Sequence, residues 1–169
     1  MGILRFFALP YPKAIYLALS ALALGGVVYY FDRPPVQFVN YINGFNYYSK
    51  GSLVFGVWGY SLPSFLHTFS LILLTAIVVG FNKRNRFHIY LFWFLIETLF
   101  EIGQHSIISP IITTSFQYLT IGTNNLIVKF FQKGTFDYMD LIATSLGALA
   151  GCVALEGKLL KKRGAYENQ

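Results

Sequence analysis

Four stretches of the chain are apolar enough to lie inside a lipid bilayer, and this feature limits the possible folds more than any other. A membrane-spanning helix needs about 20 consecutive, mostly apolar residues. Stretches that reach or approach this length lie at residues 14–31, 62–81, 87–103 and 139–155. Charged residues make up 12% of the chain, against about 25% in a typical soluble domain. The sequence therefore predicts an all-α integral membrane protein, a four-helix bundle that forms one domain over residues 1–169.

The distribution of basic residues predicts the orientation of these spans. Nine of the 13 Lys and Arg residues lie in the N-terminal arm, in the loop between the second and third spans, and in the tail 156–169. The remaining four are Arg33, Lys50, Lys129 and Lys133, in the two opposite loops. Because cytoplasmic loops carry the excess of Lys and Arg, both termini are expected in the cytoplasm, with 156–169 as a basic cytoplasmic tail.

The two loops predicted to face outward are long and carry apolar segments of their own. The first covers about residues 32–61 and is rich in Tyr and Phe, which favour the membrane interface. The second covers about residues 104–136 and contains "LIVKFF", which is too short to span and fits an interfacial position. The formal charge of +6 lies beside apolar segments, which indicates membrane lipids as partners. The sequence has no nucleic-acid-binding motif, so nucleic acid is not an expected partner.

Four of the seven acidic residues lie in or beside the last two predicted spans, where they are costly. An acid at the bilayer centre costs at least about 2.5–3.5 kcal/mol on insertion scales, so such residues usually face a protein interior or a wet cavity. In the predicted topology, polar groups from three spans reach the same outer third of the membrane. They are His67, Glu97, Glu101, Gln104, Asp137 and Asp140.

The helical spacing of these residues places them on common faces. Glu97, Glu101 and Gln104 follow an i, i+4, i+7 pattern, which is one stripe of a helix. A second stripe, i, i+3, i+7, contains Asp137, Asp140 and Thr144. The small-xxx-small pair Gly147 and Gly151 predicts a close contact with another helix on a similar face.

Two interpretations of the polar residues remain open at this level. They are candidate ligand-binding residues in an outward-facing cavity, or they hydrogen-bond across helices and fix the register of the spans. Asp137 also fits an N-cap of the fourth span. A metal held by His67, Glu101 and Asp140 lacks a local ligand signature, so no metal and no cofactor is predicted. No nucleophile motif identifies a catalytic residue, and catalysis is left open.

Three short segments carry a family resemblance. The third span ends in Glu-x-x-Gln at Glu101 and Gln104, and the fourth opens with "GTFDYMDLIATSLGALAG". A histidine, His67, lies in the preceding span in "SFLHTF". Together they resemble the VanZ-like family of small bacterial membrane proteins, named for a teicoplanin-resistance determinant, over roughly residues 62–151. The chain departs from the family pattern where an arginine is expected before the aspartates and where Thr144 replaces an asparagine.

The resemblance implies a multi-pass protein of the bacterial cytoplasmic membrane that is linked to the cell envelope and to antibiotic resistance. With the polar residues, it leads to three functional hypotheses. The first is an outward cavity that binds a polar or amphipathic envelope ligand. The second is a non-catalytic subunit that binds another membrane protein or a second copy. The third is a small proton-coupled transporter that uses Glu97 as a mid-membrane acid.

Overall fold

The computed structural model describes residues 12–32, 54–79, 83–119 and 126–156. Within these ranges the regular secondary structure is α-helical, as the sequence predicts. Four helices are long: α1 (Pro12–Asp32), α3 (Trp58–Val79), α4 (Lys83–Gly103) and α7 (Tyr138–Glu156). Two are short: α5 (Ile108–Leu119) and α6 (Leu126–Lys133).

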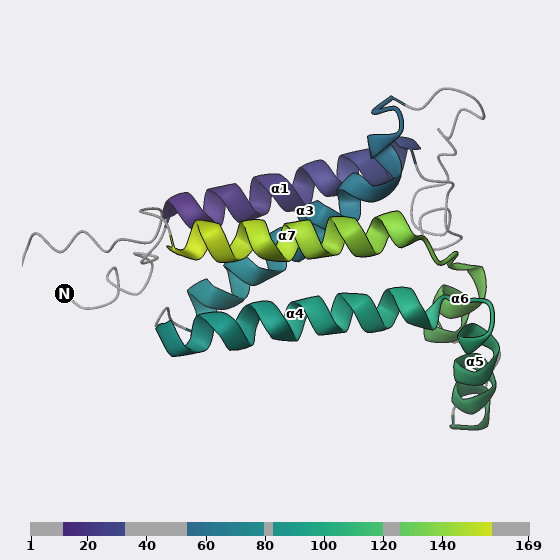
Figure 1. Cartoon of the computed structure of the whole chain (residues 1–169). Helices are drawn as coiled ribbons and strands as arrows, with labels where there is room; N and C mark the ends of the chain where they lie inside the picture. Colours follow the sequence, from purple (N-terminus) through teal and green to yellow (C-terminus); the bar gives the residue numbers. More distant parts are fainter. Residues whose placement is uncertain (1–11, 33–53, 80–82, 120–125, 157–169) are drawn as a thin grey trace, which may run out of the picture.

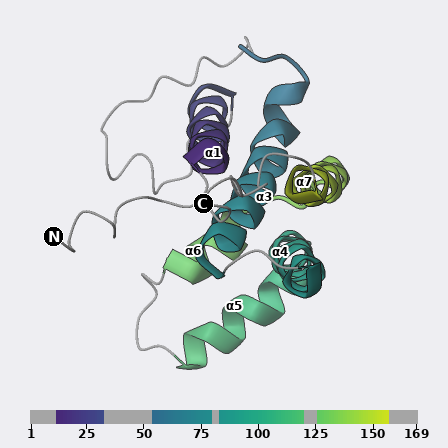
Figure 2. The ribbon, with the colours of Figure 1, turned by 90° about the vertical axis from the view of Figure 1, so that its left-hand side faces the viewer.

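Helix α3 is the centre of the arrangement of long helices. It packs against α1 on one side and against α7 and α4 on the other, and α4 also packs against α7 (Figures 1 and 2). The start of α3, the end of α4 and the start of α7 lie at the same end of the molecule (Figure 1). We call this end the pocket end, because a pocket lined in part by residues of α5 and α6 lies there. Helices α5 and α6 lie there and run across the direction of the long helices.

The core consists of small and aliphatic side chains from all four long helices. Its buried members are Ala14, Ala18, Ile72, Leu73, Ala76, Ile89, Ala148 and Leu155. Glycines allow the closest approach: a Cβ at Gly147 would lie 2.5 Å from the carbonyl oxygen of Phe65 in α3. The Trp93 indole of α4 donates a 2.7 Å hydrogen bond to the Thr75 hydroxyl of α3. Such small contact surfaces and interhelical hydrogen bonds are what hold helices together in lipid.

The short helices are fixed to the end of α4. The Phe131 ring of α6 stacks on Phe100 of α4, and it lies so close to Gly103 that a Cβ there would be 2.5 Å from the ring. In α5, the buried Ser109 hydroxyl donates a 2.6 Å hydrogen bond to the Phe131 carbonyl oxygen. These contacts join α4, α5 and α6 into one unit at the pocket end.

Each predicted span corresponds to a long helix, but one of the four helices, α4, is not apolar enough to qualify as a membrane span. Helices α1, α3 and α7 are long and apolar enough to cross a membrane. Helix α4, which contains the predicted span 87–103, falls short because its 21 residues include five charged ones: Lys83, Arg84, Arg86, Glu97 and Glu101. The segment "LIVKFF" lies in α6. Most of the first outward loop (33–53) and of the basic tail (157–169) lies outside the described residues, so those predictions are not addressed.

Candidate functional site

Asp140 forms the contact between α3 and α7 at the pocket end. Its carboxylate accepts a 2.9 Å hydrogen bond from the Ser64 hydroxyl. Only 3% of the surface of Asp140 is exposed. Thr144, one turn further along α7, is equally buried. On α3, Thr68 is buried and donates its hydroxyl hydrogen bond to the Ser64 carbonyl oxygen. The polar stripe of α7 is therefore turned into the protein, against a polar stripe of α3.

His67 and Glu97 form a second contact, between α3 and α4. The His67 Nδ1 atom lies 3.2 Å from a carboxylate oxygen of Glu97. The side chain of Glu97 is largely buried, with 17% of its surface exposed, but that of His67 is 50% exposed. The pair thus links two helices while leaving the imidazole half uncovered.

Glu101 and Asp137 form a third contact, where the chain enters α7. A Glu101 carboxylate oxygen accepts a 2.6 Å hydrogen bond from the backbone N–H of Asp137. The Asp137 carboxylate in turn accepts a 2.9 Å hydrogen bond from the N–H of Met139, in the first turn of α7. Asp137 is thus placed as an N-cap of α7, where its negative charge meets the positive end of the helix dipole.

The predicted site residues therefore do not surround one cavity: Glu101 and Asp137 meet at the pocket end, whereas His67 and Glu97 meet near the middle of α3. Ser64–Asp140, His67–Glu97 and Glu101–Asp137 are separate contacts between different elements. Within the described ranges, no three His, Cys, Asp or Glu side chains are close enough to hold a metal ion, so His67, Glu101 and Asp140 do not form the metal site considered above. Asp140 and Thr144 are buried, whereas half of the His67 side chain is exposed. Helix spacing indicated which of these residues share a face, but not their partners.

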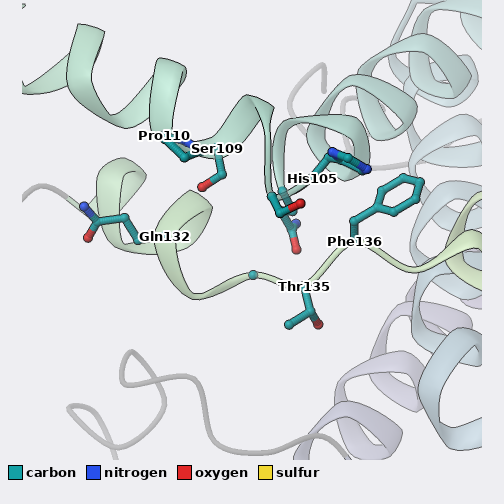
Figure 3. A pocket seen from close by; sticks show the side chains of 9 residues that line it. His105, Ser109, Pro110, Gln132, Thr135 and Phe136 are labelled. Atoms are coloured by element: carbon teal, nitrogen blue, oxygen red, sulfur yellow. The ribbon is translucent and has the colours of Figure 1, made fainter.

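An open pocket of about 510 Å³ lies between the end of α4, the start of α5 and the link from α6 to α7 (Figure 3). It is lined by Gln104, His105, Ser106, Ser109, Pro110, Gln132, Gly134, Thr135 and Phe136. Gln104 is the predicted site residue that lines it. The Gln104 side chain covers Gly134 so closely that a Cβ at Gly134 would collide with its amide.

Most lining residues were not predicted from the sequence. His105, just beyond the third predicted span, packs edge-on against Phe136 with ring centroids 5.1 Å apart. Ser109 and Pro110 come from α5, and Gln132 from α6 (Figure 3). The polar lining residues lie in two separate stretches of the second outward loop, 104–109 and 132–135. The two stretches come together because α5 packs against α6.

No protein-family model, curated protein or solved structure matches this chain.

Proposed function

We propose that the chain is a multi-pass protein of the bacterial cytoplasmic membrane, with α4 as a fourth span and the pocket end facing outward. Helix α4 has 21 residues, which is about 31 Å, and it lies alongside α3 and α7. Its cations lie at its start, and Glu97 is paired rather than turned toward lipid. Nine of the 13 basic residues then fall on the cytoplasmic side, together with both termini.

In this membrane the pocket binds a polar or amphipathic ligand of the cell envelope. The observation that supports the proposal is the contact between two of the three segments that resemble the VanZ-like family, the end of α4 and the entry to α7. Glu101 accepts a hydrogen bond from the N–H of Asp137, and Gln104 covers Gly134 at the pocket wall. On this view Glu101 and Asp140 fix the backbone, and Gln104 meets the ligand.

Replacement of Gln104 with alanine tests this division of roles. We expect Gln104→Ala to leave the folded yield in detergent unchanged but to remove the chain's effect on envelope stress or glycopeptide susceptibility. Asp140→Asn and Glu101→Gln should instead lower the yield, because each removes the charge from the acceptor of a part-buried hydrogen bond worth about 1 kcal/mol or more. Gln117→Ala, on the exposed part of α5, is the matched control. A Gln104→Ala variant with full activity in the host would contradict a ligand-binding pocket.

A second function, as a subunit that binds another membrane protein or a second copy, is favoured by the His67–Glu97 pair. His67 lies nine residues into α3, about 14 Å from its start, and half of its imidazole is exposed there. A polar group facing hydrocarbon is costly, so a partner helix that covers it would gain stability.

The second function predicts an oligomer or complex that depends on His67. His67→Leu should shift the purified protein toward the monomer in native mass spectrometry, because the polar group that a partner covers is gone. His88→Leu, an exposed histidine on α4, is the matched control. A wild-type protein that is monomeric in mild detergent and in lipid nanodiscs would rule out the homo-oligomer, and failure to co-purify any membrane protein would rule out the subunit.

A further inference from the structure

We infer that the pocket selects an uncharged, hydroxyl-rich headgroup, such as a sugar carried on a lipid, rather than a phosphate or another anion. This inference rests on the proposed function and names the ligand class of the same pocket. Among the described residues that line the pocket, six carry neutral hydrogen-bonding side chains: Gln104, His105, Ser106, Ser109, Gln132 and Thr135. No Asp, Glu, Lys or Arg is among these lining residues.

The neutral lining favours a ligand that both donates and accepts hydrogen bonds. Amide and hydroxyl side chains can do either, and so can the hydroxyl groups of a sugar. A charged headgroup that enters the pocket loses part of its hydration. No Asp, Glu, Lys or Arg from the described part of the chain lines the pocket to compensate, so its binding costs free energy. The ring of Phe136 adds an apolar wall, against which the C–H face of a sugar can pack.

The start of α5 borders the pocket but does not form an anion site. Helix N-termini attract anions through N–H groups that have no partner within the helix. Here the N–H groups of Ile108 and Ser109 both bond to the His105 carbonyl oxygen, at 2.9 Å each. The N–H of Ile107 bonds to the His105 ring at 3.3 Å, and Pro110 has no N–H. These four positions leave a phosphate no backbone donor to bind.

Exposed aliphatic residues close in sequence to the lining residues explain why the headgroup is expected on a lipid. Ile107 and Ile111, next to the lining residues Ser106 and Pro110, are 70% and 64% exposed. Ile102, at the end of α4, is 37% exposed. A polar pocket at the end of long apolar helices, with exposed aliphatic residues next to its lining residues in sequence, suits a ligand with a polar head and apolar tails.

Competition between lipids in phosphatidylcholine nanodiscs tests the inference. Diglucosyldiacylglycerol and phosphatidylglycerol are titrated against the wild-type protein, and bound lipid is measured by native mass spectrometry. We expect the glucolipid to bind about tenfold more tightly than phosphatidylglycerol. The double variant Gln132→Leu/Thr135→Val should remove that preference, because it deletes two exposed hydrogen-bonding groups with little change in volume. Thr114→Val/Gln117→Leu, on the exposed part of α5 outside the pocket, should retain it.

The outcomes separate the inference from the proposed function. Tighter binding of phosphatidylglycerol, lost in the pocket variant, would overturn the uncharged ligand class while supporting a ligand-binding pocket. Lipid binding that is equal in the pocket variant, the control variant and the wild type would overturn both. Competition by the free disaccharide as strong as that by the glucolipid would support the sugar and overturn its lipid anchor.

Discussion

Gly147→Ala is expected to lower the free energy of unfolding by about 3 kcal/mol, the upper part of the range for overpacking a well-filled core. The new Cβ would lie 2.5 Å from the carbonyl oxygen of Phe65, and 3.2 Å from its Cα and carbonyl carbon. These are backbone atoms of α3, which cannot rotate aside as a side chain can. The substitution must therefore separate α7 from α3, and with it the Ser64–Asp140 hydrogen bond.

Two other glycine substitutions give stability changes with which the loss at Gly147 can be compared. At Gly151 a Cβ would meet the Ile72 side chain at 3.0 Å, so Gly151→Ala should cost less, because that side chain can move slightly. At Gly26 nothing lies within 4 Å, and Gly26→Ala should be neutral or stabilising by up to about 1 kcal/mol, since alanine is the better helix former. Thermal unfolding in detergent, followed by circular dichroism, gives the ranking. Equal losses at Gly147 and Gly26 would contradict the proposed close contact.

The sequence predicted the four long helices, and which residues of each share a face, because both follow from local periodicity. The four apolar stretches became α1, α3, α4 and α7, with ends shifted by at most a few residues. The spacing of Gly147 and Gly151 indicated a contact face, and the structure shows both against α3. Spacing along one helix defines which residues share a face, and this information is contained in the sequence of that helix alone.

The partners of the polar residues could not be predicted, because they depend on how neighbouring helices are rotated and offset. Glu97 and Glu101 lie on one stripe of α4, yet one pairs with His67 of α3 and the other with the N–H of Asp137. A shift of α4 by one turn along α3 would bring Glu101, in place of Glu97, to the level of His67. The predicted single cavity thus became three contacts.

The pocket was missed for a related reason. Helix α5 carries Pro110 in its first turn and many Ser and Thr residues, a composition that indicates a loop. Proline is tolerated there because the first N–H groups of a helix need no partner within it. The Ser109–Phe131 hydrogen bond, which joins residues 22 positions apart, holds α5 against α6. A contact over that distance has no signature in local sequence.

Asp32→Ala is expected to cost about 3 kcal/mol, since it removes two hydrogen bonds to a carboxylate, each worth about 1.5–3 kcal/mol. The Asp32 carboxylate is fully buried at the end of α1. Its two oxygens accept hydrogen bonds of 2.7 and 2.8 Å from the N–H groups of Val54 and Phe55, just before α3. Gly59 of α3 lies directly beneath, where a Cβ would collide with the carboxylate. The sequence alone indicated only an acid flanking a span.

The position of Asp32 makes the source of this stabilisation testable. A carboxylate at a helix C-terminus faces the negative end of the helix dipole, so the helix itself does not favour the charge. Stabilisation must then come from the two N–H groups, and Asp32→Asn, which keeps one acceptor oxygen, should lose about half as much as Asp32→Ala in thermal unfolding. Asp137→Ala removes an exposed N-cap bond and should cost about 1 kcal/mol. A loss for Asp32→Ala no larger than that for Asp137→Ala would mean that these bonds do not hold α1 to the start of α3.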